Sequence, residues 1–205
     1  LNDVHLLSDV ASNTAPLAVD DAVSTQEDQP LAFNMPANDQ DQRLHFLLRY
    51  PSREAREASW KAFVADPDWQ AAYKASEANG KLVDKVENPF LVETDYSPGV
   101  KKGNVSNGGV WELRDYTTPP GRLANLDARF RDHTIKLFEK YGMTNVVYWN
   151  VPKGEKDADT LLVYLLAHKS KDAGLKSFDE FRKDADWLAA RKASEEKGGG
   201  SLTEA

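Results

Sequence analysis

Residues 110–152 read VWELRDYTTPPGRLANLDARFRDHTIKLFEKYGMTNVVYWNVP and set the architecture of the chain. The pattern begins with alternation over residues 110–116, which predicts a strand with two distinct faces. A Pro-Pro-Gly turn at 119–121 follows, and apolar residues then recur at helical spacing until Gly142. Residues 145–151 form the next apolar run of strand length. The segment therefore predicts a strand–helix–strand unit.

A repeat flanks this unit, because residues 45–80 align without gaps to residues 163–198 at an offset of 118. Sixteen of the 36 aligned positions are identical, which is too many for chance. Each copy predicts a short strand, a capping Ser, a helix, a break at Asp-x-Asp-Trp and a second helix. Gly80 and Gly198 are expected to end the second helices in the left-handed conformation. The order from 110 to 198 is β-α-β-β-α, one strand short of a ferredoxin-like unit.

These ordered motifs resemble the NIPSNAP family over about residues 43–205. The motifs that carry the resemblance are Glu112-Leu113-Arg114 with Tyr116, Phe130 with His133, Leu137-Phe138, Gly142-Met143 and Tyr148-Trp149. The resemblance implies an α+β fold of the dimeric α/β-barrel type, in which two ferredoxin-like sheets form one barrel between chains or between tandem modules. It implies no established catalytic activity, although relatives with this fold include cofactor-independent monooxygenases and small-molecule-binding proteins.

The expected organisation has four segments: an acidic lead at 1–42, a partial first NIPSNAP-like module at 43–96, a linker at 97–109 and a second module at 110–205 without its last strand. The fold is thus expected to be incomplete at both ends, with an irregular or β-rich N-terminal segment. Eight of the 33 acidic residues and none of the 26 basic residues lie in the lead. The net charge of −7 therefore belongs to the lead, and the nearly neutral body offers no electrostatic footprint for nucleic acid.

Three further absences narrow the class of protein. The chain has no cysteine, which excludes disulfides, thiol nucleophiles and thiolate metal sites. No apolar run approaches the roughly 18 residues that suggest a membrane span, and no targeting signal is visible.

Residues 15–41 of the lead are similar to the opening of bacterial cadherin-like or VCBS-type adhesin repeats, with an AVDD segment, an ED-P turn and an AND-D loop. Residues 19–25 and 31–35 are the strands expected there. This resemblance favours a bacterial extracytoplasmic location. Carboxylates that could bind Ca²⁺ lack a complete loop motif, and a solvated pair of acidic turns is the alternative; they are Asp20, Asp21, Asp39 and Asp41.

His133 is one candidate for chemistry. It lies three residues after Phe130 and four before Leu137, so helical spacing places it on the apolar side of its helix. A histidine there could act as a base or ligand in a pocket, whereas the alternative is a core histidine hydrogen-bonded to a carbonyl or carboxylate. His168 aligns with Tyr50 in the repeat, which weakens a catalytic role for it.

Arg114 is the second candidate, since it shares a strand face with Glu112 and Tyr116. Its guanidinium could clamp a small anion, and an ion pair within the sheet is the alternative. Aromatic residues that could line an apolar ligand pocket, or else form sheet core, are Trp111, Tyr116, Tyr148 and Trp149.

The chain carries no phosphate-binding glycine loop, nucleophile elbow or convincing metal spacing, so no cofactor is expected. The favoured hypothesis is binding of a small apolar ligand or a protein through an α/β-barrel. One alternative is a cofactor-independent oxygenase or isomerase that uses His133 and Arg114. Another is an extracellular adhesin fragment. Unpaired strands of an incomplete barrel also predict self-association, through sheet edges or barrel pairing.

Overall fold

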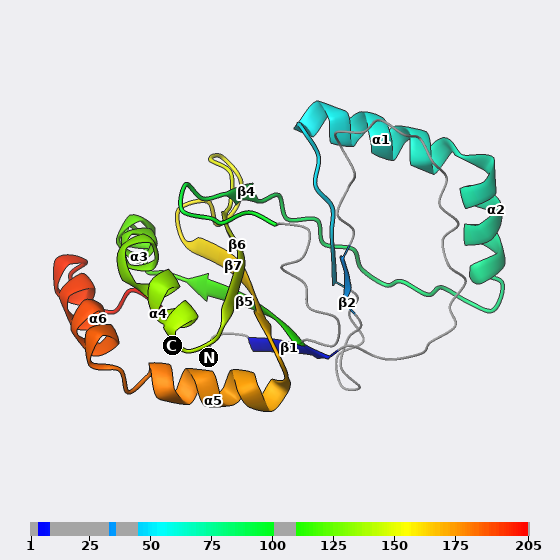
Figure 1. The fold of residues 1–205 in the computed structure, drawn as a ribbon. Coiled ribbons are helices and arrows are strands. Elements are labelled where there is room, and N and C mark those ends of the chain that lie inside the picture. Colours follow the sequence, from blue (N-terminus) through cyan, green and yellow to red (C-terminus); the bar gives the residue numbers. More distant parts are fainter. Residues whose placement is uncertain (1–3, 9–32, 36–44, 101–109, 205) are drawn as a thin grey trace. The chain divides into compact units, whose positions relative to one another are not determined.

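The computed structural model describes residues 4–8, 33–35, 45–100 and 110–204 (Figure 1). The chain divides into unit 1, residues 1–11 with 89–205, and unit 2, residues 12–88. The elements are, in chain order, β1 (Val4–Ser8), β2 (Phe33–Met35), β3 (His45–Leu47), α1 (Arg53–Ala65), α2 (Pro67–Ser76), β4 (Val92–Glu93), β5 (Val110–Thr117), α3 (Leu123–Arg129), η1 (Phe130–Thr134), α4 (Ile135–Lys140), β6 (Thr144–Asn150), β7 (Leu161–His168), α5 (Lys171–Phe181) and α6 (Ala185–Lys197).

Unit 1 is built on an antiparallel sheet of five strands in the order β1-β5-β7-β6-β4. β5 and β7 pair over their whole length, and β6 pairs with the other edge of β7. Along the chain, β5, the helix α3–η1–α4, β6, β7 and the helices α5 and α6 follow the β-α-β-β-α order predicted for residues 110–198. The α+β class is therefore confirmed.

β1 occupies the position that a final strand of a ferredoxin-like unit would take beside β5. Its pairing runs from Val4 opposite Arg114 to Ser8 opposite Val110. Further along the same edge, the backbone N–H of Glu204 donates to the carbonyl of Thr117 at 2.9 Å. Residues 4–8 of the acidic lead thus satisfy the exposed backbone groups of β5 at the edge where the last strand that residues 110–205 are expected to lack would pair.

The opposite edge of the sheet is paired over a shorter stretch, at the end of β6. β4 pairs with β6 at Trp149 and Asn150. The backbone of Tyr148 is also engaged, because its N–H donates to Ser97 Oγ at 3.1 Å and its carbonyl accepts from the N–H of Thr94 at 3.0 Å. The outer edge of β6 is thus paired at its C-terminal end.

The helices of unit 1 cover one face of this sheet (Figure 1). The core on that face contains Leu123, Leu126, Phe130, Leu137, Phe138, Met143, Tyr148, Leu162, Tyr164, Leu166, Phe178, Phe181 and Leu202. Alternation along the strands places a second set of buried apolar residues on the other face, outside this core, namely Leu113, Val147, Val163 and Leu165. The sheet therefore has two apolar faces, of which the helices cover one.

The helix pairs α1–α2 and α5–α6 have the same local geometry. Ser52 Oγ accepts from the third N–H that follows it at 3.1 Å, and Ser170 Oγ does the same at 3.1 Å. Asp66 and Asp184 cap the second helices through two backbone N–H groups each, at 2.8 to 3.0 Å. The predicted caps are confirmed, because they depend only on residues that are close in sequence.

The predicted C-terminal glycines behave differently from each other. Gly80 has a positive φ of 127°, but α2 already ends at Ser76 with Glu77 as its C-cap, so Gly80 does not end this helix. Gly198 has φ −83°, and the left-handed residue is Gly199 at 73°. Helix α6 is therefore followed by its left-handed residue one position later than predicted.

Unit 2 contains the antiparallel hairpin β2–β3 and the helices α1 and α2, which have no buried residue. The expected strand at 31–35 is confirmed over 33–35, whereas the expected strand at 19–25 and the four calcium candidates lie outside the described residues. Residues 33–36, FNMP, resemble residues 149–152, WNVP, at the end of β6. The end of β2 thus has a short sequence likeness to the end of β6.

Candidate functional site

Three charged or titratable side chains form a buried cluster under α5. Glu112 and Arg114 lie on the same face of β5, and His168 ends β7. Glu112 Oε1 accepts a hydrogen bond from Arg114 Nη1, and Glu112 Oε2 lies 2.7 Å from His168 Nε2. The Glu112 and His168 side chains are 3% and 1% exposed, so one carboxylate serves two partners in dry surroundings.

Aromatic rings enclose the guanidinium of this cluster. Arg114 lies over the ring of Phe178 at 4.6 Å, and Arg114 Nη2 donates to the Tyr116 hydroxyl at 3.0 Å. Cation–π contact of this kind stabilises a desolvated arginine. Burial raises the pKa of the neighbouring Tyr164 hydroxyl well above its usual value, so this tyrosine stays neutral beside the cluster.

A glycine in α5 allows the helix to approach the cluster. A Cβ added at Gly174 would lie 3.0 Å from His168 Cγ and 3.1 Å from His168 Nδ1. The equivalent residue in α1 is Arg56, and the equivalent of His168 is Tyr50. Gly174 and His168 therefore form a packing pair that the first copy does not have.

The arrangement is suited to charge compensation rather than to catalysis. Each Glu112 oxygen has a protein partner, and all three side chains are buried. The ion pair within the sheet, one of the two interpretations of Arg114, is confirmed, whereas a clamp for an anion would need a guanidinium open to a ligand. His168 Nδ1 and Arg114 Nε are buried without a hydrogen-bond partner.

His133 lies elsewhere, on the exposed side of its helix. Residues Phe130–Thr134 form a π-helix between α3 and α4, in which Phe130 and Thr134 are buried. A π turn contains an extra residue and rotates the side chains of the turn relative to an α-helix. The expectation that His133 faces the apolar side is wrong because it assumed a constant helical period, and the structure does not bring His133 and Arg114 together.

The four aromatic pocket candidates lie on two different faces of the sheet. Tyr116 and Tyr148 lie on the helix-covered face, each with its ring 5.2 Å from that of Tyr164. Trp111 and Trp149 lie on the opposite face, opposite Ala167 and Val163 of β7 respectively. The four side chains therefore do not line one pocket, and Tyr148 is a fully buried core residue.

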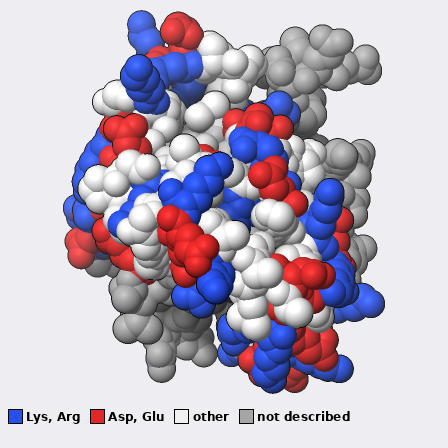
Figure 2. All heavy atoms as spheres, turned by 90° about the vertical axis from the view of Figure 1, so that its left-hand side faces the viewer, with Lys and Arg blue, Asp and Glu red and all other residues white. Residues whose placement is uncertain are grey.

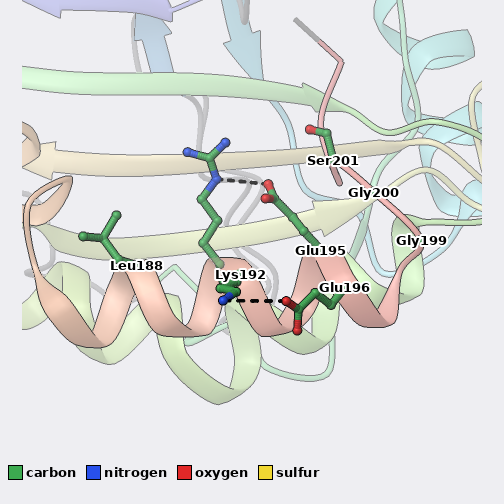
Figure 3. Close-up of a pocket in the computed structure, with 8 residues that line it drawn as sticks. Leu188, Lys192, Glu195, Glu196, Gly199, Gly200 and Ser201 are labelled. Atoms are coloured by element: carbon green, nitrogen blue, oxygen red, sulfur yellow. Dashed lines mark hydrogen bonds and ion pairs between the residues drawn. The ribbon is translucent and has the colours of Figure 1, made fainter.

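Two surface depressions on the described residues are open and contain neither His133 nor Arg114. One lies between α6 and the chain that follows it (Figure 3). Its charged side chains pair with each other, since Arg191 binds Glu195 at 3.0 Å and Lys192 lies 3.9 Å from Glu196. This lining leaves few free groups for a ligand.

On the face shown in Figure 2, basic and acidic side chains are interspersed, so neither sign of charge gathers into one patch there. The described residues contain no group of three or more His, Asp or Glu side chains that could hold a metal ion. Within the same residues, no helix is both long enough and apolar enough to cross a membrane.

A second cluster fixes α6 against α4. Asp184 Oδ2 accepts from Lys140 Nζ and from the Tyr141 hydroxyl, each at 2.6 Å, while Oδ1 caps α6. The hydrogen bond from Lys140, followed by that from Tyr141, holds the pKa of Asp184 well below its usual value of 3.8. Because the folded state favours the ionised carboxylate, this contribution to stability is complete above the usual pKa and is lost as the pH falls through the lowered pKa.

We expect Asp184→Asn to reduce the melting temperature of unit 1 most near neutral pH, with a difference from the wild type that shrinks as the pH falls below about 4. Thermal unfolding followed by circular dichroism from about pH 7 to about pH 3 measures this difference. Asp66→Asn is the matched control, since Asp66 caps α2 in the same geometry without the Lys140 and Tyr141 contacts. A difference that does not vary with pH would contradict this account.

Sequence reasoning missed the Glu112–His168 contact. The alternation of β5 already placed Glu112 on the core side with Arg114, which signals a buried charge pair. His168 could be added only from the register of β5 and β7, in which Val110 lies opposite His168.

Comparison with known proteins gives one match. The family model described as NIPSNAP matches residues 24–98 and 111–199, which together cover most of the chain. The first range begins within the acidic lead and includes β2, and nothing in the described residues supports the adhesin resemblance of that segment. No curated protein and no solved structure matches the chain.

Proposed function

The chain belongs to the NIPSNAP family, and we propose that it is an interaction module whose five-stranded sheet pairs with the same sheet of a second copy. The observation that carries this proposal is the second apolar face of the sheet. Its members Leu113, Val163 and Leu165 are apolar and only 8%, 6% and 0% exposed although the helices of unit 1 pack on the other side, so this face is of the kind that is covered. Sheets with such faces pack against each other at about 10 Å, and the family fold is a dimeric barrel.

The covered edges of the sheet support face pairing over edge pairing. The two edge strands β1 and β4 are short, with five and two residues, so an added strand finds few backbone groups to pair with. A symmetric dimer uses the same surface on both copies, which an apolar face provides.

We also propose that the two matched ranges are copies of one module. The shared caps of α1–α2 and α5–α6 support this, as does the likeness of FNMP to WNVP. Neither the oxygenase hypothesis nor the adhesin hypothesis gains support from the positions of His133 and Arg114 or from β1 and β2.

Trp149→Lys is expected to weaken dimerisation, because it places a charge on the half-buried second face. We expect light scattering to show a dimer mass for the wild type and a dimer dissociation constant at least about tenfold higher for the variant.

Leu188→Lys introduces the same charge on α6, where Leu188 is 50% exposed, and should leave the mass unchanged. A wild type that is monomeric at all concentrations would refute face pairing. Equal effects of the two variants would show that added charge, rather than the sheet face, matters.

A further inference from the structure

An exposed aromatic row runs along α1 and α2. Its members are Trp60, Phe63, Trp69 and Tyr73, and we call it the α1–α2 face. The rings follow one another with centroids 5.5, 4.4 and 5.8 Å apart. Phe63, Trp69 and Tyr73 are 41%, 38% and 47% exposed. Contiguous apolar surface of this kind marks an interaction site.

The repeat shows what such a face packs against. Phe178 and Phe181 occupy the equivalent positions to Trp60 and Phe63, and they are only 6% and 4% exposed. The Phe181 ring lies 4.4 Å from Trp187 at an interplanar angle of 36°, which matches the 4.4 Å and 34° of Phe63 and Trp69. The two helix pairs therefore present the same aromatic arrangement, one buried and one open.

The covering element in unit 1 is the helix formed by α3, η1 and α4. The centroid of the Phe138 ring lies 5.6 Å from that of Phe178 and 4.9 Å from that of Phe181. Lys140 and Tyr141 then bind Asp184, the cap of α6. The helix thus carries a Phe-x-Lys-Tyr pattern. Its Phe packs against the aromatic rings of α5, and its Lys and Tyr side chains donate to the carboxylate that caps α6.

Unit 2 repeats the receiving surface but not this helix. Asp66 caps α2 as Asp184 caps α6. Phe46 and Leu48 are 45% and 36% exposed, whereas their equivalents Tyr164 and Leu166 are fully buried. Within the described residues, unit 2 has no counterpart of α3 and α4.

We propose that the α1–α2 face is a docking surface for an amphipathic helix of another polypeptide that carries the Phe-x-Lys-Tyr pattern. The Phe packs between Trp60 and Phe63, and the Lys and Tyr reach Asp66. This mode resembles helix-in-groove recognition, in which an amphipathic helix lays its apolar face on an apolar surface of its partner. This surface lies outside the five-stranded sheet, so the proposal does not depend on face pairing.

A labelled peptide of residues 122–142, which contains α3, η1 and α4, tests the proposal. We expect a saturable rise in fluorescence anisotropy when the full chain is added, together with a gain in peptide helicity. Phe63→Asp in the chain should weaken binding at least about tenfold, as expected for an apolar anchor. The peptide with Phe138→Asp should weaken it similarly, and Asp66→Asn should reduce it to a smaller extent.

Leu82→Asp is the control in the chain, because Leu82 is 69% exposed in unit 2 and lies outside the α1–α2 face. It should leave the affinity within about twofold of the wild type. An absence of saturable binding would overturn the proposal. So would binding that Phe63→Asp leaves unchanged, since the peptide would then be replacing its own counterpart in unit 1.

Discussion

Glu112→Ala is expected to lower the free energy of unfolding of unit 1 by about 3–5 kcal/mol, the range for breaking a buried ion pair from one side. The substitution leaves Arg114 charged and buried, with only Tyr116 as a hydrogen-bond acceptor, and removes the partner of His168 Nε2. Hydrogen exchange of the β5 and β7 amides measures the loss in unit 1 itself, and chemical unfolding gives its magnitude.

A combined apolar replacement separates charge compensation from a specific role of the cluster. Glu112→Leu with Arg114→Met and His168→Phe removes all three charged or titratable side chains of the cluster. Such replacements are often neutral or stabilising, so we expect stability to return to within about 1 kcal/mol of the wild type or above it. A triple variant as unstable as Glu112→Ala would show that packing in this region depends on the polar side chains themselves.

The parts of the fold that depend on nearby residues could be predicted from the sequence. The strand expected at 110–116 is β5, and the one expected at 145–151 is β6 shifted by one residue. Alternation and apolar run length determine such strands locally. Ser170 and Asp184 cap their helices as expected, since a cap is a contact over two or three residues.

Contacts between distant residues could not be predicted in this way. β1 reaches β5 across more than a hundred residues, and no local pattern in residues 4–8 names that partner. His133 was misplaced because a π turn interrupts the helical period, and the sequence of that turn carries no simple marker. The Glu112–His168 contact required the register of two strands, which is a property of the sheet.

Gly174→Ala is expected to destabilise unit 1 by about 1–3 kcal/mol, the usual range for overpacking a core. The new Cβ would lie 3.0 Å from the ring of His168, which is held by Glu112 and has little room to move. Alanine is otherwise the better helix former, by about 1 kcal/mol over glycine. The predicted loss of stability is therefore the cost of the steric clash with His168 minus the gain in helix propensity.

The sign of this effect should reverse when the ring is removed. In a His168→Ala background the added methyl group meets no imidazole, so Gly174→Ala should raise stability by up to about 1 kcal/mol relative to His168→Ala alone. Chemical unfolding of the four proteins of this cycle measures the coupling. Lys176→Ala, on the exposed side of α5, is the control and should change stability by less than about 0.5 kcal/mol in either background. If Gly174→Ala has the same effect with and without the imidazole, then His168 is not what requires a glycine in α5, and the close approach of helix and histidine is a consequence of the fold rather than a constraint on it.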